Sequence, residues 1–436
     1  MPTMNAPQII TELPGPRARA VIEAEAGVAS RSLIKEYPLV VDHGEGMVIE
    51  DVDGNRFLDF MAGIAVTLTG HCHPDVVARI QRQAGQLLHI CGTDFYYRAY
   101  TELCERLAAL GPGDSAWRVF LGNSGAEAVE GAVKLARNHT RRQHIIAFYG
   151  AFHGRTYGAL SLTASKIKQR AGFGPMLPGV MHMPYGACRR CAYHLTYPAC
   201  DVHCFDSWRE TIFQSKLAPD EVAAVIVEPI QGEGGHTVPP PDFFPRLRRL
   251  CDDYGILLIA DEVQSGMGRT GTFFAMEQWG VVPDIITLAK GLGSGLPISA
   301  VMAKDEIMTW PRGSHGSTFG GNPVSCVAAL ATLDLIRNRL MANAVEMGAY
   351  LRSHLTALQT RYPAVTDVRG KGLMLAMEFA EDGQAAAFEH GCFQRGLLVL
   401  GCGRNAVRLA PPMIVTKAEA DTAAAIMDTV LADLEG

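Results

Sequence analysis

The sequence lacks the long apolar segments that mark membrane and exported proteins. No uninterrupted apolar run approaches the roughly 20 residues that a bilayer-spanning helix needs. The N-terminus, MPTMNAPQIITELPGPRARA, does not have the basic-then-apolar order of a secretory signal. We therefore expect a cytoplasmic protein with no membrane partner.

Positive charge is also scarce. Lys and Arg total 39 against 45 Asp and Glu, which gives a formal net charge of −6. No basic block of the kind that follows a phosphate backbone is present, so we expect no nucleic-acid partner. Internal repeats, heptad runs and low-complexity linkers are lacking too, which argues against a rod, a solenoid or a tethered array.

The chain does contain enough apolar residues for a sizeable core. It has 436 residues, of which 48% are hydrophobic, and this length favours more than one domain. From about residue 100, helical segments alternate with short, continuously apolar runs, which is typical of strands covered on both faces of a mostly parallel sheet. The runs are 118–121, 144–148, 223–227, 256–260, 285–288 and 298–302.

The two ends of the chain have a different pattern. The alternating stretch 46–66, centred on Asp53-Gly54, predicts an antiparallel hairpin. Beyond about residue 334 come a helical segment, apolar stretches at 368–379 and 406–415, and an Ala-rich helix. We expect an α/β fold in which a large domain (76–334) has a mostly parallel sheet flanked by helices. A smaller α+β domain would form from both termini, namely 1–75, which includes an N-terminal arm, and 335–436.

Ligands of parallel α/β sheets collect beyond the carboxyl ends of the strands. The run 118–121 is followed by GNSGAE, in which Gly125 and Ala126 open a helix. Glycines and free N–H groups at a helix start suit a phosphate. The alternative is a plain strand-to-helix turn with Asn123 or Ser124 as its cap.

Two further strand ends carry charge. Asp261-Glu262 follows 256–260, and a buried carboxylate there needs a cation or a hydrogen-bond donor unless it simply caps a helix. Lys290 follows 285–288, and a desolvated lysine becomes an amine nucleophile, although a single lysine more commonly reaches solvent. A phosphate cradle, an acid and a lysine together meet the requirements of a pyridoxal phosphate site.

The segment GMGRTG at 266–271 matches the dinucleotide fingerprint G-x-G-x-x-G. Its context argues against that function, because five residues separate it from the preceding apolar run. The sequence that follows, TGTFFAMEQWG, does not open a clear helix. We therefore expect no Rossmann dinucleotide site here.

Eight ordered segments between about residues 45 and 415 make the chain resemble the class III aminotransferases, which are fold-type I pyridoxal phosphate enzymes. The segments are DGNRFLDFMAGIAVTLTGHCHP, GNSGAEAVEGAVKLAR, AFHGRTYGALSLT, VEPIQGEGG, LLIADEVQSGMGRTG, PDIITLAKGLGSGLP, GSTFGGNPVSCVAALA and NAVRLAPPMIV. The resemblance implies the fold, the cofactor pyridoxal 5′-phosphate, and transfer of an amino group from an ω-amino acid to 2-oxoglutarate. The expected amino donor is 4-aminobutyrate first, then ornithine or acetylornithine.

The resemblance also implies a role for each matching residue. Lys290 is the Schiff-base lysine, and Asp261 is the partner of the pyridine nitrogen. The other implied cofactor contacts are Ser124, Gly125 and Ala126 at the phosphate, Phe152 on the ring face with His153 beside it, Gln264 near the phenolic oxygen, Glu228 nearby, and Thr318 at the phosphate of the neighbouring subunit. Because the site is shared, the resemblance implies a homodimer, alone or paired into a tetramer.

Three residues are implied in substrate choice. Arg155 resembles the arginine that 4-aminobutyrate enzymes use for a substrate carboxylate. Glu233 and Arg408 resemble a switch pair, in which Arg408 binds the α-carboxylate of glutamate or 2-oxoglutarate and Glu233 neutralises it otherwise. The alternative is a permanent ion pair between Glu233 and Arg408. The rival reaction is amino-acid racemisation or epimerisation within the same architecture, against which Arg155 argues.

Eleven cysteines are too few for a disulfide scaffold in a chain of this length. Four of them form the pattern C-x₂-C-x₈-C-x₃-C at Cys188, Cys191, Cys200 and Cys204. Thiolates at such spacing could hold zinc or an iron–sulfur centre, but the second pair matches the usual spacing only loosely. Disulfide or redox pairing and buried free thiols are the alternatives, and we assign no metal from the sequence.

Overall fold

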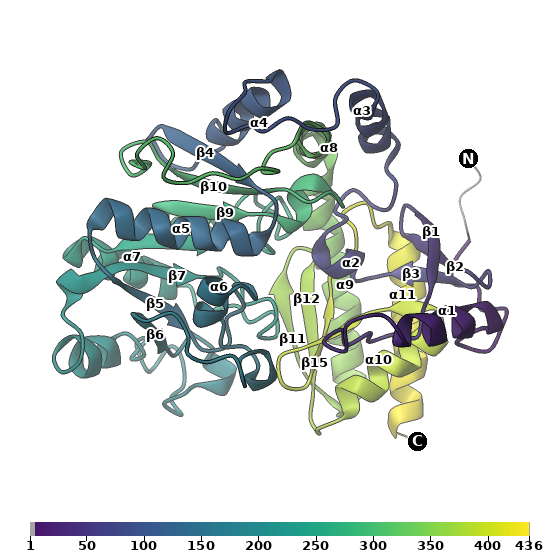
Figure 1. Ribbon diagram of the computed structural model, residues 1–436. Coiled ribbons are helices and arrows are strands. Elements are labelled where there is room, and N and C mark those ends of the chain that lie inside the picture. The colour runs from purple at the N-terminus through teal and green to yellow at the C-terminus, as the bar shows by residue number, and fades with distance from the viewer. Residues whose placement is uncertain (1–4, 436) are drawn as a thin grey trace. The chain divides into compact units, whose positions relative to one another are not determined.

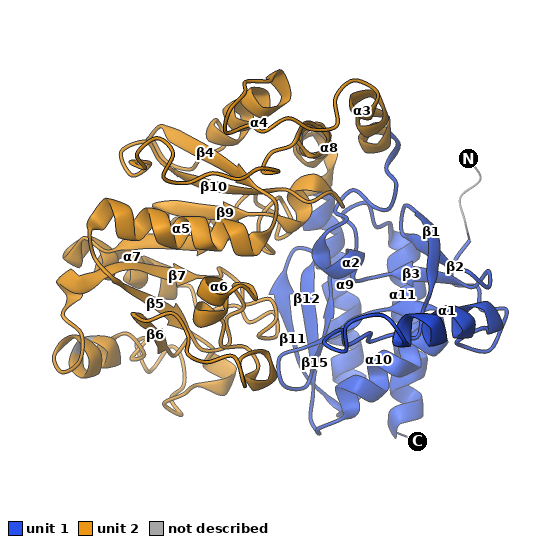
Figure 2. Cartoon of the chain, viewed as in Figure 1, with its two compact units in different colours: residues 1–74, 342–436 blue, residues 75–341 orange. Residues whose placement is uncertain are grey.

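The computed structural model describes residues 5–435, which divide into two compact units (Figures 1 and 2). Unit 1 is made from Met1–Pro74 and Ala342–Gly436, and unit 2 is Asp75–Met341. Every described helix is too short or too polar to cross a lipid bilayer.

Unit 2 is built on a seven-stranded sheet with the order β4-β10-β9-β8-β7-β5-β6. Strand β10 runs antiparallel to both of its neighbours, and all the other neighbouring pairs are parallel. The strands are β4 (Trp117–Gly122), β5 (His144–Phe148), β6 (Val180–Met183), β7 (Val222–Val227), β8 (Leu257–Asp261), β9 (Ile285–Leu288) and β10 (Ser299–Lys304).

Each of the six apolar runs predicted from the sequence overlaps one of these strands. The pattern predicts them well because the central strands are buried on both faces, as β7 and β9 are along their whole length. Strand β6 was not predicted. It lies at the edge of the sheet, and only Met183 of its four residues is fully buried, so it has no continuous apolar signal.

Helices cover both faces of this sheet (Figure 1). Ile145 and Ala147 of β5 belong to one apolar cluster with α5 (Gly125–Thr140), whereas Ile146 and Phe148 belong to another with α7 (Phe243–Tyr254). This alternation is the two-residue period of a strand. The other α-helices of unit 2 are α3 (Pro74–Ala84, whose first residue belongs to unit 1), α4 (Arg98–Ala108), α6 (Tyr157–Leu162) and α8 (Pro323–Leu335). The short 3₁₀ helices are η1 (Ile167–Gln169), η2 (Cys188–Arg190), η4 (Pro219–Glu221), η5 (Ala275–Trp279) and η6 (Lys290–Gly293), and η3 (Trp208–Phe213) and η7 (Ile336–Leu340) are π-helical.

Unit 1 contains two four-stranded sheets, with the orders β1-β2-β3-β13 and β11-β12-β15-β14. Their strands are β1 (Val41–Glu45), β2 (Val48–Asp51), β3 (Arg56–Asp59), β11 (Val365–Lys371), β12 (Met374–Phe379), β13 (Leu397–Leu398), β14 (Leu400–Cys402) and β15 (Ala406–Leu409). The helices are α1 (Pro16–Ala26), α2 (Ala62–Ala65), α9 (Met341–Arg361), α10 (Gln384–Gln394) and α11 (Lys417–Glu435). Since β13 pairs with β3, the two ends of the chain share one sheet.

The predicted hairpin is confirmed, because β2 and β3 are antiparallel around Gly54, whose φ is 88°. The two apolar stretches near the C-terminus also contain strands. The stretch 368–379 contains parts of two strands joined at Gly372, where φ is 52°. The stretch 406–415 contains β15, which ends at Leu409, shortly before Pro411 and Pro412, which have no N–H to give to a sheet.

Candidate active site

Asp261 is the last residue of β8, and its carboxylate is buried. Oδ1 accepts hydrogen bonds from the backbone N–H of Val263 (3.1 Å) and from Oγ1 of Thr287 (3.1 Å). Thr287 lies directly opposite Asp261 in the register of β8 and β9. Oδ2 lies 2.6 Å from Nδ1 of His153. The carboxylate is therefore fixed by groups from three segments of the chain.

His153 lies in the loop that follows β5 and is itself buried. Its backbone N–H donates to Oγ1 of Thr163 (2.9 Å), which anchors the loop. Nδ1 faces Asp261, whereas Nε2 is a buried polar atom that has no hydrogen-bond partner among the described residues. A buried nitrogen of this kind is ready for a ligand group, because leaving it unpaired costs about 1–3 kcal/mol.

Lys290 is the first residue of η6 and is half-buried. It comes three residues after Thr287, whose hydroxyl already touches Asp261. The pairing of β8 with β9 therefore brings the acid and the lysine to the same edge of the sheet. This is the arrangement that the sequence predicts from two separate strand ends.

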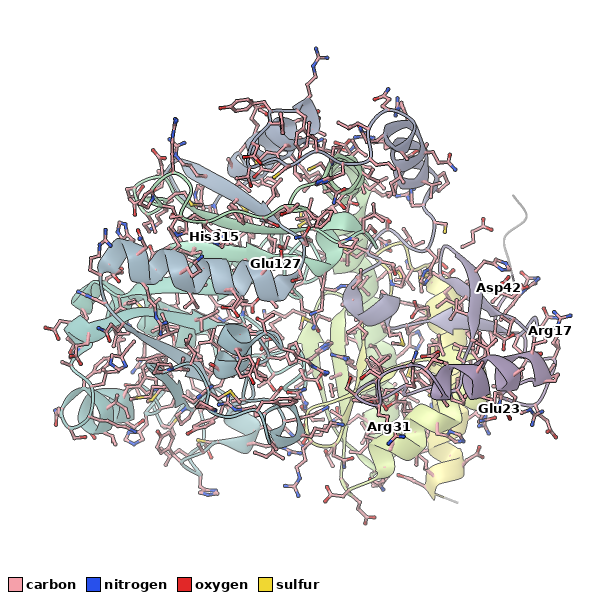
Figure 3. All side chains as sticks on the ribbon, viewed as in Figure 1. Arg17, Glu23, Arg31, Asp42, Glu127 and His315 are labelled. Carbon is pink, nitrogen blue, oxygen red and sulfur yellow. The ribbon has the colours of Figure 1, made fainter. Side chains whose placement is uncertain are left out.

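The start of α5 forms the next part of this edge. Ser124 is the N-cap, and its hydroxyl accepts from the N–H of Glu127 (3.2 Å; Glu127 is labelled in Figure 3). The capping role that we kept as an alternative is thus observed for Ser124. The N–H groups of Gly125 and Ala126 lie in the first turn, where no intrahelical acceptor exists. A Cβ on Gly125 would lie 2.9 Å from Cγ1 of Val263, so glycine lets the helix start close to the end of β8.

Glu228 directly follows β7 and is buried. Oε1 accepts from the N–H of Phe152 (2.8 Å), and Oε2 accepts from the N–H of Gly232 (2.9 Å). Burial raises the pKa of this carboxyl to about 7; nearby Asp261 raises it further, whereas His153 lowers it. Glu228 thereby ties the loop after β5 to the loop after β7.

Three more predicted residues lie on loops of unit 2. Arg155 is exposed, and its guanidinium carbon is 5.9 Å from the centre of the Phe152 ring. Gln264 faces His236, with 3.2 Å between Oε1 and Nε2. Thr318 is exposed.

Glu233 forms an ion pair that the sequence did not predict. Its Oε1 lies 2.6 Å from Nζ of Lys166. Lys166 was missed because a single lysine in a loop carries no spacing signal. Arg408 belongs to unit 1, where it is buried on β15 opposite Ala376 of β12 and Leu400 of β14.

Two sequence alternatives are also resolved. Glu262 is buried, and its oxygens accept from Oγ of Ser265 (2.5 Å) and the N–H of Met276 (2.9 Å), so hydrogen-bond donors satisfy it. Burial raises its pKa to about 7. Residues 262–274, all of them described, form only turns and bends after β8. The helix that a dinucleotide fingerprint needs does not begin there.

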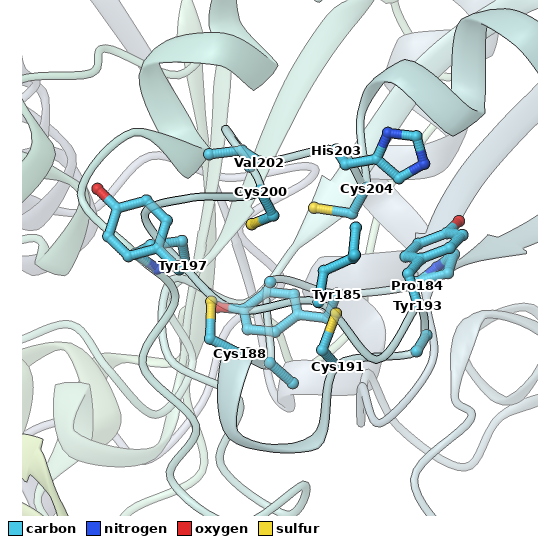
Figure 4. A pocket seen from close by; sticks show the side chains of 15 residues that line it. Pro184, Tyr185, Cys188, Cys191, Tyr193, Tyr197, Cys200, Val202, His203 and Cys204 are labelled. Carbon is cyan, nitrogen blue, oxygen red and sulfur yellow. The ribbon is translucent and has the colours of Figure 1, made fainter.

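The four clustered cysteines lie apart from these strand ends. All four are free thiols, and they line one cavity together with His203 (Figure 4). The lining of this cavity includes none of the predicted cofactor contacts.

Comparison with known proteins identifies the family. A model of the class III aminotransferases matches residues 31–431. The chain belongs to the class III aminotransferases. Its fold class, α/β with the fold-type I architecture, is confirmed, and it is a pyridoxal phosphate-dependent aminotransferase.

Two relatives and one solved structure illustrate the match. The chain is 39% identical to the 4-aminobutyrate aminotransferase GabT of Escherichia coli, over 92% of this chain and 95% of that protein. It is also 39% identical to the alanine/serine racemase of Pyrococcus horikoshii, over 99% and 94%. An amine transaminase from an uncultivated Pseudomonas species, solved with pyridoxal phosphate bound, superimposes with a TM-score of 0.86 at 32% identity, over 93% and 98% of the two chains.

Proposed function

We propose that this aminotransferase moves an amino group from an ω-amino acid to 2-oxoglutarate. The preferred donor is 4-aminobutyrate, followed by ornithine and acetylornithine. The observation that carries the proposal is the buried Asp261 carboxylate, which His153 and Thr287 fix on the strand next to the one that Lys290 follows. Asp261 and Lys290 resemble the acid and the lysine of the family pattern.

The residues present fit pyridoxal phosphate. Asp261 would accept a hydrogen bond from the protonated ring nitrogen of the cofactor. The N–H groups of Gly125 and Ala126 would face its phosphate. Phe152 would cover the ring, and Lys290 would hold the aldehyde. When bound, the cofactor supplies an electrophilic carbon for amines and a ring that accepts electron density from the substrate.

The protein's own contribution is to hold charge and to move one proton. Nζ of Lys290 would take the proton from the substrate carbon that bears the amino group, and a positioned base of this kind contributes about 10²–10⁴-fold. Asp261 would offer its carboxylate in a fixed position, because Nδ1 of His153, the N–H of Val263 and Oγ1 of Thr287 already contact it. Since His153 and Thr287 fix its orientation, no reorganisation is needed during the reaction.

Substrate selection would use charged side chains. Arg155 is exposed and would bind the distal carboxylate of 4-aminobutyrate. Arg408 is proposed, from the resemblance alone, as the ligand of the α-carboxylate of glutamate or 2-oxoglutarate. Glu233 is proposed to neutralise Arg408 with other substrates, and Lys166 offers Glu233 a cationic partner within unit 2.

A homodimer is part of this proposal. Phe95 and Phe319 are more than half exposed, and Tyr96 is fully exposed. The segment before Phe95 and Tyr96 contacts the segment of Phe319, because the rings of His89 and Phe319 are 4.9 Å apart. Exposed apolar surface of this kind marks an interaction site, and Thr318 lies beside it. A second copy would cover it and receive Thr318 at its cofactor phosphate.

Racemisation is the second candidate, since one relative of equal identity is named an alanine/serine racemase. The two reactions differ in their need for a 2-oxo acid. Transamination consumes 2-oxoglutarate and forms glutamate, whereas racemisation of alanine needs no second substrate.

The test is a screen of 4-aminobutyrate, ornithine and acetylornithine with 2-oxoglutarate, run beside an assay of optical activity with L-alanine alone. We expect glutamate from 4-aminobutyrate and no loss of optical activity. Arg155→Met should raise the KM for 4-aminobutyrate about 10–100-fold, since a hydrogen bond to a charged group contributes about 1.5–3 kcal/mol. Arg155→Lys, which keeps the charge, is the matched control. Racemisation without glutamate formation would contradict the proposal.

A further inference from the structure

The segment between β6 and η3 has an unusual structure for a compact domain. Residues 184–205 contain no strand, and their only helical element is the short turn η2. Long irregular segments of this kind are uncommon and usually functional. His194, Asp201 and Val202 have left-handed φ angles of 56°, 47° and 56°, which non-glycine residues adopt only where the surrounding structure imposes them.

This segment lines a cavity of about 30 Å³. Two of its turns contribute a pair of thiols each, Cys188 with Cys191 and Cys200 with Cys204. Figure 4 shows the two pairs on opposite sides of the cavity, with their sulfur atoms directed toward the space between them. Sequence spacing and cavity therefore bring four soft donor atoms around one centre.

The donor set favours zinc. Zinc prefers thiolate sulfur as a ligand, and a bound divalent cation would offset the mutual repulsion of four thiolates that line one cavity.

We propose that Cys188, Cys191, Cys200 and Cys204 bind one structural Zn²⁺ ion. Four thiolates from two turns are a standard tetrahedral ligand set for zinc. Binding would release four protons and leave a centre of charge −2, near which Arg189 and Arg190 lie in the same turn as Cys188.

The thiols surround the cavity rather than meet in it. As the side chains stand, no group of three or more His, Cys, Asp or Glu residues within 5–435 is placed to hold a metal ion. Zinc binding therefore requires the two turns to move closer together. Such a movement would not break a sheet, since residues 184–207 contribute no strand.

The metal would stabilise a segment that contacts the candidate active site. Tyr185 lines the cavity, and its hydroxyl donates to the carbonyl groups of Glu228 (3.1 Å) and Pro229 (3.0 Å). Zinc would thereby stiffen the segment that contacts the end of β7. We expect a contribution to thermal stability and none to the chemical step.

The first experiment measures metals in the purified full-length protein by mass spectrometry of the elements, after dialysis against a weak chelator. We expect about one zinc ion per chain. X-ray absorption at the zinc edge should give four sulfur ligands at about 2.3 Å. Cys188→Ser and Cys204→Ser should lose zinc and lower Tm by several degrees, whereas Cys72→Ser, an exposed cysteine outside the cluster, should keep both.

Five results would overturn the proposal. The first four are the absence of zinc after expression with added zinc and reconstitution of the reduced protein, retention of zinc in both cluster variants, nitrogen and oxygen ligands alone, and iron with sulfide in place of zinc. The fifth is an intact mass that shows two hydrogens lost per cysteine pair, which would assign disulfides instead. Because the ligand atoms of the zinc are measured directly, a variant that fails to fold does not decide the outcome.

Discussion

The strand ends of unit 2 and its cysteine segment each bring reactive side chains together, but they do so in different ways. Asp261 and Thr287 face each other because β8 and β9 are hydrogen-bonded in register, and each oxygen of Asp261 already has a partner. Cys188 and Cys204 lie on turns and line one cavity, and burial raises the pKa of both thiols. A site on strands has its geometry before a ligand arrives, whereas a site on turns takes its final geometry from the ligand.

The largest expected effect comes from removing the lysine of the strand-end site. Lys290→Ala should lower kcat by about 10³-fold or more, because both the covalent attachment and the proton transfer are lost. Circular dichroism should remain that of the wild type, since the sheet does not depend on this side chain. Lys168→Ala, an exposed lysine of η1, is the control and should keep full turnover. Turnover by the Lys290 variant at the wild-type rate would contradict the assignment.

Asp261→Asn tests whether the charge at the end of β8 matters beyond its shape. The amide has the size of the carboxylate but no negative charge, and we expect kcat to fall about 10²–10³-fold. The affinity for pyridoxal phosphate should fall as well, as measured by titration of the apoenzyme. Thr287→Val removes only one hydrogen bond to the same carboxylate and should cost about 10-fold or less. Equal effects from both variants would argue that geometry, and not charge, is decisive.

The buried glutamates predict how stability depends on pH. The pKa values of Glu228 and Glu262 are both raised, to about 7, so the folded state holds their protons more tightly than the unfolded state does. Their favourable contribution is complete below about pH 4.5 and is lost as the pH rises through about 7, at a cost of about 3 kcal/mol per group.

Urea unfolding at pH 5 and pH 8 measures this dependence. Glu262→Gln removes one titrating group and should reduce the loss of unfolding free energy between the two pH values by about 3 kcal/mol. Glu277→Gln, which replaces an exposed glutamate, is the control. A variant with the same pH dependence as the wild type would show that Glu262 is already ionised at pH 5.

The smallest expected effect concerns the ion pair of Glu233. Lys166→Met removes the cation 2.6 Å from Glu233 and should change the KM for the amino donor only about two- to five-fold, because the pair is partly exposed. Steady-state kinetics with 4-aminobutyrate and with glutamate as donors would detect it. A change of about 100-fold would give Lys166 a direct role in binding substrate.

The same contrast between strands and loops explains how much the sequence could predict. Buried parallel strands have a continuous apolar signal, and their ends point to Asp261 and Lys290 as candidate site residues. Edge strand β6 was missed because solvent on one side removes that signal. The partners Thr287 for Asp261 and Lys166 for Glu233 come from register and loop geometry, which spacing along the chain does not encode.

The central claim is that Lys290 carries the cofactor. The most direct measurement is reduction of the pyridoxal phosphate-loaded protein with borohydride, followed by proteolysis and mass spectrometry of the peptides. The account predicts a pyridoxyl phosphate group on the peptide that contains Lys290 and on no other lysine at comparable yield. A protein that stays unlabelled after the cofactor is supplied, or one labelled at a different lysine, would contradict it.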